Sequence, residues 1–282
     1  MLCPDQEAEF RRLLREWIAD FQGNLGTLSD AKLDGLVNSY VDQEALYGEK
    51  VDWILETIGR TPERVLEIGS STGGLSVAFA LRGASVDGIE PSAAGVAASR
   101  LRAGRAGVPG AAFHVGVGER LPFDAGRFDM VVSLAVLEHV QDPLAVAREA
   151  WRVLRVGGVA IFEVPNNWFP FEGHYKIAFP PMAPRWLARA YLRARNRDPS
   201  FLDTLHYMSR GSVRRVFQAA GFRDVVDIYG EWIAGKAAGA DWSRTRHRAP
   251  LPHWSRHIVG TILRMPLTAQ ALNRAVTVVA TK

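Results

Sequence analysis

Residues 65–74 read Val-Leu-Glu-Ile-Gly-Ser-Ser-Thr-Gly-Gly, an apolar run that carries one acid, Glu67, and leads directly into a glycine turn. Gly69 and Gly73 lack a Cβ atom, so the backbone can turn tightly there and approach a ligand closely. The turn leads into a helix N-terminus, whose free N–H groups point at whatever is bound. The pattern therefore predicts a β-strand, a ligand-binding turn and an α-helix in succession.

A second apolar run, residues 84–89, ends in another acid, Glu90. A carboxylate at the end of the next parallel strand can accept hydrogen bonds from both hydroxyls of a ribose. The turn is not a dinucleotide fingerprint, because Ser71 stands where the second glycine of G-x-G-x-x-G would be. It is not a phosphate-binding P-loop either, because no Gly-Lys-Ser/Thr follows. Two acids without a pyrophosphate cradle favour a ligand that carries a positive charge and a ribose.

The middle of the chain alternates strand-like and helix-like segments, which predicts a parallel sheet with helices on both faces. Gly157 and Gly158 follow the helix expected at 142–155 and mark its end and a turn. A further helix at 209–220 and strands at 222–228 and 274–281 complete the chain. The strands are expected at 64–68, 84–89, 111–115, 128–133 and 157–164, and the helices at 74–82, 92–105 and 142–155.

Residues 1–60 are predicted to form a helical cap, because apolar side chains between Phe10 and Phe21 recur at helical spacing. Further helices are expected at 30–47 and 49–58. Two segments exceed what the sheet needs: 165–208 after the fifth strand and 230–272 between the last two strands. Loops of this length are usually functional or disordered.

The composition limits the class of protein and its expected location. The apolar content of 48% is that of a globular protein. No segment approaches the roughly 20 apolar residues of a membrane span, and the N-terminus lacks a signal-peptide pattern. The single cysteine, Cys3, allows no internal disulfide and no structural zinc framework, so no metal site is predicted. A cytoplasmic location is expected, and the oligomeric state stays open.

The stretch 65–73 resembles motif I of the class I S-adenosylmethionine-dependent methyltransferases, V-L-D-x-G-x-G-x-G, with Glu67 in place of Asp and Ser71 in place of the middle Gly. Residues 154–158 resemble that family's L-R-P-G-G segment. The resemblance implies a Rossmann-like α/β fold with a seven-stranded sheet over 61–282, a helical cap and two substrate-side insertions. It also implies S-adenosylmethionine as the cofactor.

Residues 116–123 resemble the family segment G-D-A-E-x-L-P-F, with Val117 in place of the Asp that usually bonds the adenine. Gly118 or Glu119 is expected to serve instead. The resemblance implies that Glu67 holds the methionine end and that Glu90 holds the ribose. The cofactor-binding residues predicted in this way are Glu67, Gly69, Ser70, Gly73, Glu90, Gly118, Glu119 and Ser133.

Three histidines are candidates for the catalytic end of the site. Residues 133–140 contain Leu-Glu-His-Val, which resembles the signature of ubiquinone- and menaquinone-type methyltransferases and points to His139 as a base, a substrate ligand or a helix-cap residue. His174 lies among aromatic residues in the first insertion, where an imidazole could take a hydroxyl proton, oriented by Glu172 or Tyr175. His206 is a further candidate, and each of these could equally be structural.

The second insertion interleaves arginines and histidines with Trp242 and Trp254. This composition is compatible with a solvated helical lid, with nucleic acid, or with peripheral membrane contact through 242–264. The leading hypothesis is an O-methyltransferase acting on a small molecule of a natural-product or glycan pathway. No nucleic-acid partner is expected under it. The alternatives are an RNA methyltransferase, which the net charge of +4 allows, and a non-catalytic scaffold protein with the methyltransferase fold.

Overall fold

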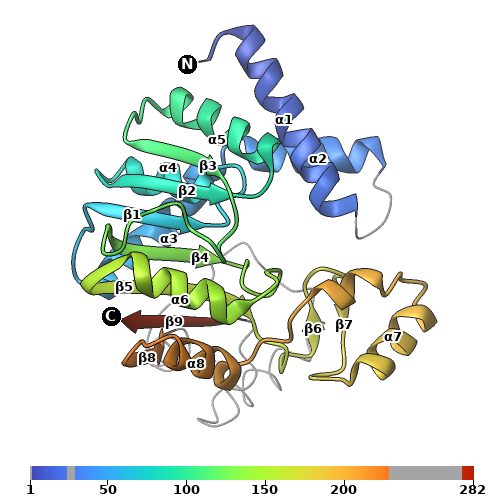
Figure 1. Ribbon diagram of the computed structural model, residues 1–282. Coiled ribbons are helices and arrows are strands. Elements are labelled where there is room, and N and C mark those ends of the chain that lie inside the picture. The colour runs from blue at the N-terminus through green and yellow to red at the C-terminus, as the bar shows by residue number, and fades with distance from the viewer. Residues whose placement is uncertain (1, 24–28, 229–274) are drawn as a thin grey trace, which may run out of the picture.

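The computed structural model describes residues 2–23, 29–228 and 275–282 (Figure 1). A seven-stranded sheet of order β3-β2-β1-β4-β5-β9-β8 forms its centre. The first five strands are parallel, and β9 pairs antiparallel with both β5 and β8. This confirms the predicted Rossmann-like α/β class. The strands are β1 (Arg64–Ile68), β2 (Ser85–Glu90), β3 (Ala111–Val115), β4 (Phe128–Leu134), β5 (Leu154–Pro165), β8 (Asp224–Asp227) and β9 (Ala275–Thr281).

Helices cover both faces of the sheet, because successive strand residues point to opposite sides. Leu66 of β1 packs into a cluster with α6 (Pro143–Val153) and α8 (Arg210–Ala219). Its neighbour Val65 packs into another cluster with α3 (Gln43–Ile58) and α4 (Gly74–Ala80). α5 (Ala93–Ala106) lies beside α4 and contacts β3. The strand order reverses direction at β1, so the open end of the sheet at β1 and β4 is where a ligand crevice is expected.

The N-terminal cap consists of α1 (Pro4–Gly23) and α2 (Asp30–Val41), which pack on α5. The predicted helix boundary near residue 48 was wrong, because the break falls at Asp42 and α3 runs through Gly48 without interruption. Gly48 instead marks a close approach: its carbonyl accepts a 2.9 Å hydrogen bond from Arg82, and a Cβ there would lie 3.3 Å from that guanidinium. The cap boundary at residue 60 stays a prediction, since α3 packs on the sheet.

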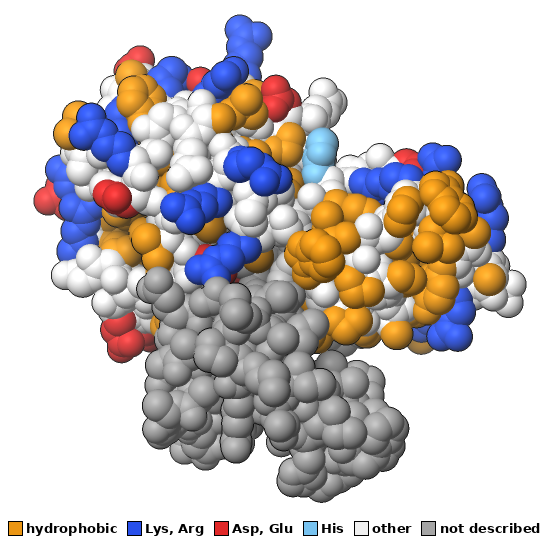
Figure 2. Space-filling model, turned by 90° about the horizontal axis from the view of Figure 1, so that it is seen from below, with side chains coloured by type: hydrophobic (Ala, Val, Ile, Leu, Met, Phe, Trp, Pro, Cys, Tyr) orange, Lys and Arg blue, Asp and Glu red, His pale blue; other side chains and the backbone are white. Residues whose placement is uncertain are grey.

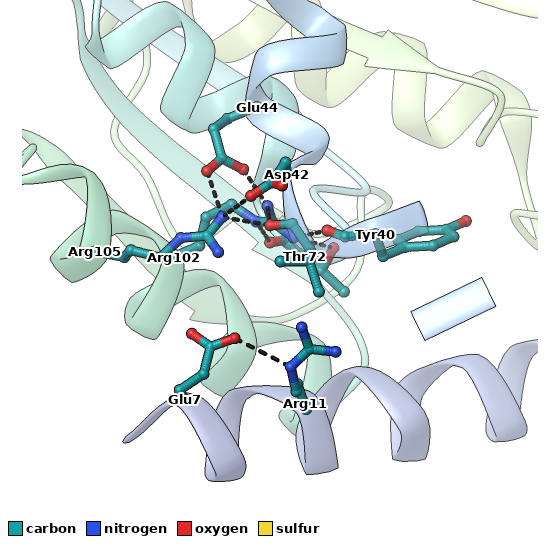
Figure 3. A network of polar contacts seen from close by, with 9 residues as sticks. Glu7, Arg11, Tyr40, Asp42, Glu44, Thr72, Arg102 and Arg105 are labelled. Atoms are coloured by element: carbon teal, nitrogen blue, oxygen red, sulfur yellow. Dashed lines mark hydrogen bonds and ion pairs between the residues drawn. The ribbon is translucent and has the colours of Figure 1, made fainter. Parts of the chain in front are cut away.

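A fully buried arginine joins the cap to the glycine turn (Figure 3). Arg102 of α5 donates hydrogen bonds to the carbonyl oxygens of Thr72 at 2.7 Å, Val41 at 2.9 Å and Tyr40 at 2.6 Å. Its charge pairs with Glu44, which also pairs with Arg105. A buried guanidinium is tolerated only when its donors are satisfied in this way. The network therefore fixes the position of the turn relative to the cap.

The predicted turn at Gly157 lies inside a strand. α6 ends at Val153, β5 already begins at Leu154, and the register between β4 and β5 shifts between the Phe128 and Met130 pairs. Gly157 has φ 75°, so the chain bulges there and then rejoins the sheet. The helix therefore ends two residues earlier than expected.

The first insertion, 165–208, forms a lobe beside the sheet, with β6 (Phe171–Glu172), β7 (Ile177–Ala178), α7 (Arg185–Ala194) and the 3₁₀ helix η1 (Ser200–Thr204) (Figure 1). It has its own hydrophobic cluster, which includes Tyr175, Leu192 and Phe201. Hydrophobic side chains also gather on its exposed surface (Figure 2), and Trp186 of α7 is 71% exposed.

The second insertion, 230–272, lies outside the described residues, and so does the segment 242–264 proposed for peripheral membrane contact. None of the helices in the described ranges combines the length and the hydrophobicity of a membrane span.

Candidate functional site at the carboxyl ends of β1 and β4

The glycine turn keeps its shape although a serine replaces the middle glycine. Gly69 and Gly73 have φ angles of 75° and 81°, and Ser71 between them has φ 54°. This left-handed conformation costs a non-glycine residue about 1 kcal/mol. The Ser71 N–H donates a 2.9 Å hydrogen bond to Glu90 Oε2, which helps to hold that conformation. The departure from the family motif therefore leaves the turn intact.

Glu67 lies at the crevice end of β1 and is 5% exposed. Its carboxyl group accepts a hydrogen bond from the Ser76 hydroxyl of α4. Burial raises the pKa of Glu67 to about 8, because the charged form loses its hydration there, while the bonds from Ser76 act in the opposite direction. The end of β1 thus carries a buried acid with a raised pKa, and a cation bound beside it would favour the ionised carboxylate.

Glu90 lies at the tip of β2, where three donors hold its carboxylate. They are the N–H groups of Ser71 at 2.9 Å and Ser92 at 3.2 Å and the indole N–H of Trp17 at 3.4 Å. Burial raises the pKa of Glu90, and the backbone bonds counteract this rise. Trp17 belongs to α1, so the cap contacts the acid that is predicted to hold the ribose, a contact that the sequence did not indicate.

The remaining predicted cofactor residues have structural contacts in this conformation. Ser133 donates a 2.9 Å hydrogen bond to the Ile68 carbonyl and so ties β4 to β1. The Glu119 carboxylate accepts bonds from the N–H groups of residues 141 and 142, at 2.8 and 3.4 Å. Gly118 packs on Ile68, and Ser70 is buried under Gly88 of β2. Their contacts with the cofactor stay predictions.

Two of the predicted histidines meet, although 35 residues separate them. Nε2 of His174 lies 3.2 Å from Nε2 of His139, and Nδ1 of His174 lies 2.7 Å from Glu172 Oε1. A carboxylate can only accept, so Nδ1 of His174 carries the proton. The N–H of Tyr175 donates to the other Glu172 oxygen at 2.7 Å. Glu172 therefore orients His174. The sequence had left Glu172 and Tyr175 as the two candidates for this role.

The two imidazoles have opposite pKa shifts. Burial, together with the neighbouring charge of His174, lowers the pKa of His139 to about 4. Burial also acts against the charged form of His174, but the hydrogen bond and charge of Glu172 outweigh it and raise its pKa. The pair consequently shares at most one positive charge near neutral pH.

A second acid lies beside the pair. Glu138 is 1% exposed, and neither of its carboxylate oxygens has a hydrogen-bond partner among the described residues. One of them lies 3.7 Å from His139 Nε2. Burial raises the pKa of Glu138 to about 7.

The third candidate, His206, lies apart from this group. Its Nε2 lies 2.9 Å from the Val140 carbonyl, and its backbone N–H donates to the Glu138 carbonyl at 2.8 Å. Its contacts therefore tie the first insertion to the loop after β4. A catalytic role for His206 stays a prediction without a supporting contact.

Helix α1 connects Glu90 with the histidine pair. Trp17, which bonds Glu90, stacks on Phe21 with ring centroids 5.4 Å apart. Phe21 in turn meets the His139 ring edge-on at 5.8 Å. The Glu90 carboxylate and the histidine pair thus lie under the same face of one helix, as the cofactor and acceptor ends of a single site would.

Part of the chain is similar in sequence to known methyltransferases. Residues 66–162 match the sequence model of a family described as a methyltransferase domain. A ubiquinone biosynthesis O-methyltransferase from Pseudomonas savastanoi pv. phaseolicola is 31% identical over 151 residues, which span 51% of this chain and 65% of that protein. Its counterpart from Pseudomonas aeruginosa is 34% identical over 144 residues, which span 49% and 62%. The chain thus covers less than two thirds of either relative.

Among solved structures, geranyl diphosphate methyltransferase in complex with S-adenosylmethionine aligns over 92% of both chains, with a TM-score of 0.52 and 18% identity. At this identity the likeness shows the fold. Residues 66–162 are therefore similar to a methyltransferase domain, and the chain has the fold of an S-adenosylmethionine-dependent methyltransferase. Over about half of its length, its sequence is similar to the sequences of ubiquinone biosynthesis O-methyltransferases.

Proposed function

We propose that this protein transfers the methyl group of S-adenosylmethionine to a hydroxyl oxygen of a small organic molecule. The observation that carries the proposal is that one helix, α1, contacts both Glu90 beside the glycine turn, through Trp17, and the histidine pair, through Phe21. The similarity to ubiquinone biosynthesis O-methyltransferases supports oxygen as the acceptor atom.

The residues of the turn fit the cofactor. Glu67 is a buried acid whose only hydrogen-bond donor among the described residues is Ser76, so it can accept a bond from the ligand's ammonium group. Glu90 has two oxygens at the strand tip for the ribose hydroxyls. S-adenosylmethionine supplies an activated methyl group, so the protein has to position the acceptor and promote loss of its proton. Val136 packs against Gly69 and Trp17 against Glu90, so we expect both side chains to move when the cofactor binds.

The histidine pair is proposed as the acceptor end of the site. His139 follows β4 closely in sequence, and His174 comes from the first insertion and approaches it to 3.2 Å. The rings of Phe21 and Phe201 flank His139 at 5.8 and 5.9 Å, so an apolar acceptor has aromatic walls to contact. The side chains of both histidines keep some exposure, 20% for His139 and 16% for His174, which leaves access from solvent.

The proposal is tested by incubating the purified protein with S-adenosylmethionine and a panel of hydroxylated sugars, polyketides and quinone precursors, with mass spectrometry of the products. These classes represent the natural-product and glycan pathways. His174→Ala should lower turnover at least tenfold with unchanged cofactor affinity, whereas Glu90→Ala should weaken cofactor binding more than tenfold by removing both ribose contacts. Full turnover in His174→Ala would contradict the assigned acceptor end.

The two alternative hypotheses have distinct signatures. A scaffold protein would bind no S-adenosylmethionine in calorimetry. An RNA methyltransferase would bind RNA with a strong dependence on salt. The basic cluster that suggested RNA belongs to the second insertion, outside the described residues, so the described structure adds nothing to that hypothesis.

A further inference from the structure

Three side chains around the histidine pair present metal-binding atoms to a common point. Glu138, His139 and His174 each offer one such atom, and all three lie within 4.8 Å of one another. Two ligands on opposite sides of one ion are separated by about 4.2 Å. Small side-chain rotations are therefore enough to bring the three atoms onto a single ion.

The nitrogen atoms already have the spacing of a metal site. Two nitrogens that each lie about 2.1 Å from an ion and 3.2 Å from each other, as Nε2 of His139 and of His174 do, subtend an angle of roughly 100° at the ion. This value falls between octahedral and tetrahedral geometry. A distance of 3.2 Å between these nitrogens also suits a hydrogen bond between the two imidazoles. The other contacts of the three side chains therefore have to decide between a hydrogen-bonded pair and a metal site.

The surroundings of His174 and Glu138 favour the ion. Ligating histidines almost always donate the other ring N–H to a carboxylate, which turns the free lone pair toward the metal. His174 does this through its 2.7 Å contact with Glu172, which the Tyr175 N–H holds in place. Glu138 is a buried carboxylate without a hydrogen-bond partner among the described residues, an arrangement that is costly unless a cation completes it.

We propose that Glu138, His139 and His174 bind one divalent first-row transition-metal ion at the acceptor end of the site. Two imidazoles and one carboxylate suit such an ion better than Mg²⁺ or Ca²⁺, which prefer oxygen ligands. Three protein ligands leave positions open for an acceptor hydroxyl.

The role of the ion in catalysis rests on the proposed function. An acceptor hydroxyl that binds the ion becomes more acidic and releases its proton to solvent. The acceptor oxygen then forms a bond to the methyl carbon while the carbon–sulfur bond breaks, and the sulfur leaves as a neutral thioether. The histidines act here as ligands, not as the base.

The metal site can be tested without any acceptor. The chelator-treated protein is titrated with Co²⁺, whose visible absorption reports its coordination, and Zn²⁺ is added as a competitor. We expect one Co²⁺ per chain, displaced by Zn²⁺. His174→Ala and Glu138→Gln should weaken binding at least tenfold, and Glu172→Gln roughly 10- to 100-fold. Thermal melts establish that each variant is folded.

His114→Ala is the matched control, because His114 also contacts a carboxylate, Asp87 at 2.8 Å, but lies on β3 outside the three-ligand group. It should bind Co²⁺ as the parent protein does. Absence of Co²⁺ binding by the parent protein, or unchanged binding in folded Glu172→Gln, Glu138→Gln and His174→Ala, would overturn the proposal.

Turnover separates this inference from the proposed function. Methyl transfer that persists after chelation would leave the function standing and remove the ion's role. Co²⁺ binding that depends on Glu138 and His174, in a protein that never consumes S-adenosylmethionine, would establish the site and refute the function.

Discussion

Cofactor binding should release a proton from Glu67. Burial raises the pKa of this acid to about 8, so in the free protein at pH 6 it is almost entirely protonated. An ammonium group that binds there requires the carboxylate, and its charge then holds the pKa of Glu67 low. Binding therefore removes the proton that burial had retained.

The magnitude follows from the distance between the working pH and the pKa. At pH 6, two units below about 8, ionising Glu67 costs roughly 3 kcal/mol, which corresponds to about a 100-fold weaker affinity than for a protein in which it is already ionised. Raising the pH from 6 to 7 should tighten binding about tenfold. Above pH 7 the ligand's own amino group begins to titrate, with a pKa of about 7.7–8.0, so the useful window is pH 6–7.

Isothermal titration calorimetry with S-adenosylhomocysteine measures the effect. The titration is run at pH 6.5 in phosphate and in a buffer with a large ionisation enthalpy. The two observed heats should differ by about the difference between the ionisation enthalpies of the two buffers, because about one proton is released per ligand bound. Glu67→Gln should bind more weakly at pH 7 and lose most of the buffer dependence. Glu90→Gln is the matched control, since Glu90 also has a raised pKa but is assigned to the ribose. Identical heats in both buffers for the parent protein would refute the reasoning.

The other predictions concern stability. Between pH 4.5 and about 8 the folded protein holds the Glu67 proton more tightly than the unfolded chain, so Glu67 lowers the stability of the free protein as pH rises through this window; Glu67→Gln should raise the melting temperature at pH 8 and change little at pH 4. Arg102→Met should cost about 3–5 kcal/mol in denaturant unfolding, because it removes the donor to the buried carbonyls of Thr72 and Tyr40 and one of the two arginines that pair with Glu44; a loss below about 1 kcal/mol would contradict the assigned role. Ser71→Gly should increase the free energy of unfolding by up to about 1 kcal/mol, since glycine accepts φ 54° without strain, and a decrease in the same measurement would show that the serine side chain stabilises the turn.

The sequence predicted the bounds of strands well where a short run of residues defines them. The bounds of β1 and β3 agree with the expected 64–68 and 111–115, because apolar runs bordered by turn residues define short buried strands. The boundary between α2 and α3 was missed for a tertiary reason. Gly48 looks like a helix break in the sequence, but it accommodates Arg82 from the end of α4.

The sequence likewise predicted some features of the candidate site and could not show others. The motif around Glu67 and Glu90 indicated a cofactor turn, since its residues are close in sequence or follow adjacent strands. The motif could not show whether Ser71 would preserve the turn, which depends on the hydrogen bond to Glu90. Glu119 and Ser133 were expected to contact the cofactor, and their observed bonds hold the loop before α6 and the end of β4.

The sequence by itself determined the class of fold and predicted the cofactor end of the site, because strand, turn and helix signals and the motif around Glu67 lie within a few consecutive residues. Only the tertiary structure brought Glu138, His139 and His174 together and placed Trp17 on Glu90. These contacts join segments 35 and 73 residues apart. No local pattern encodes these contacts, because they depend on how the cap packs against the end of β2 and how the first insertion packs against the loop after β4.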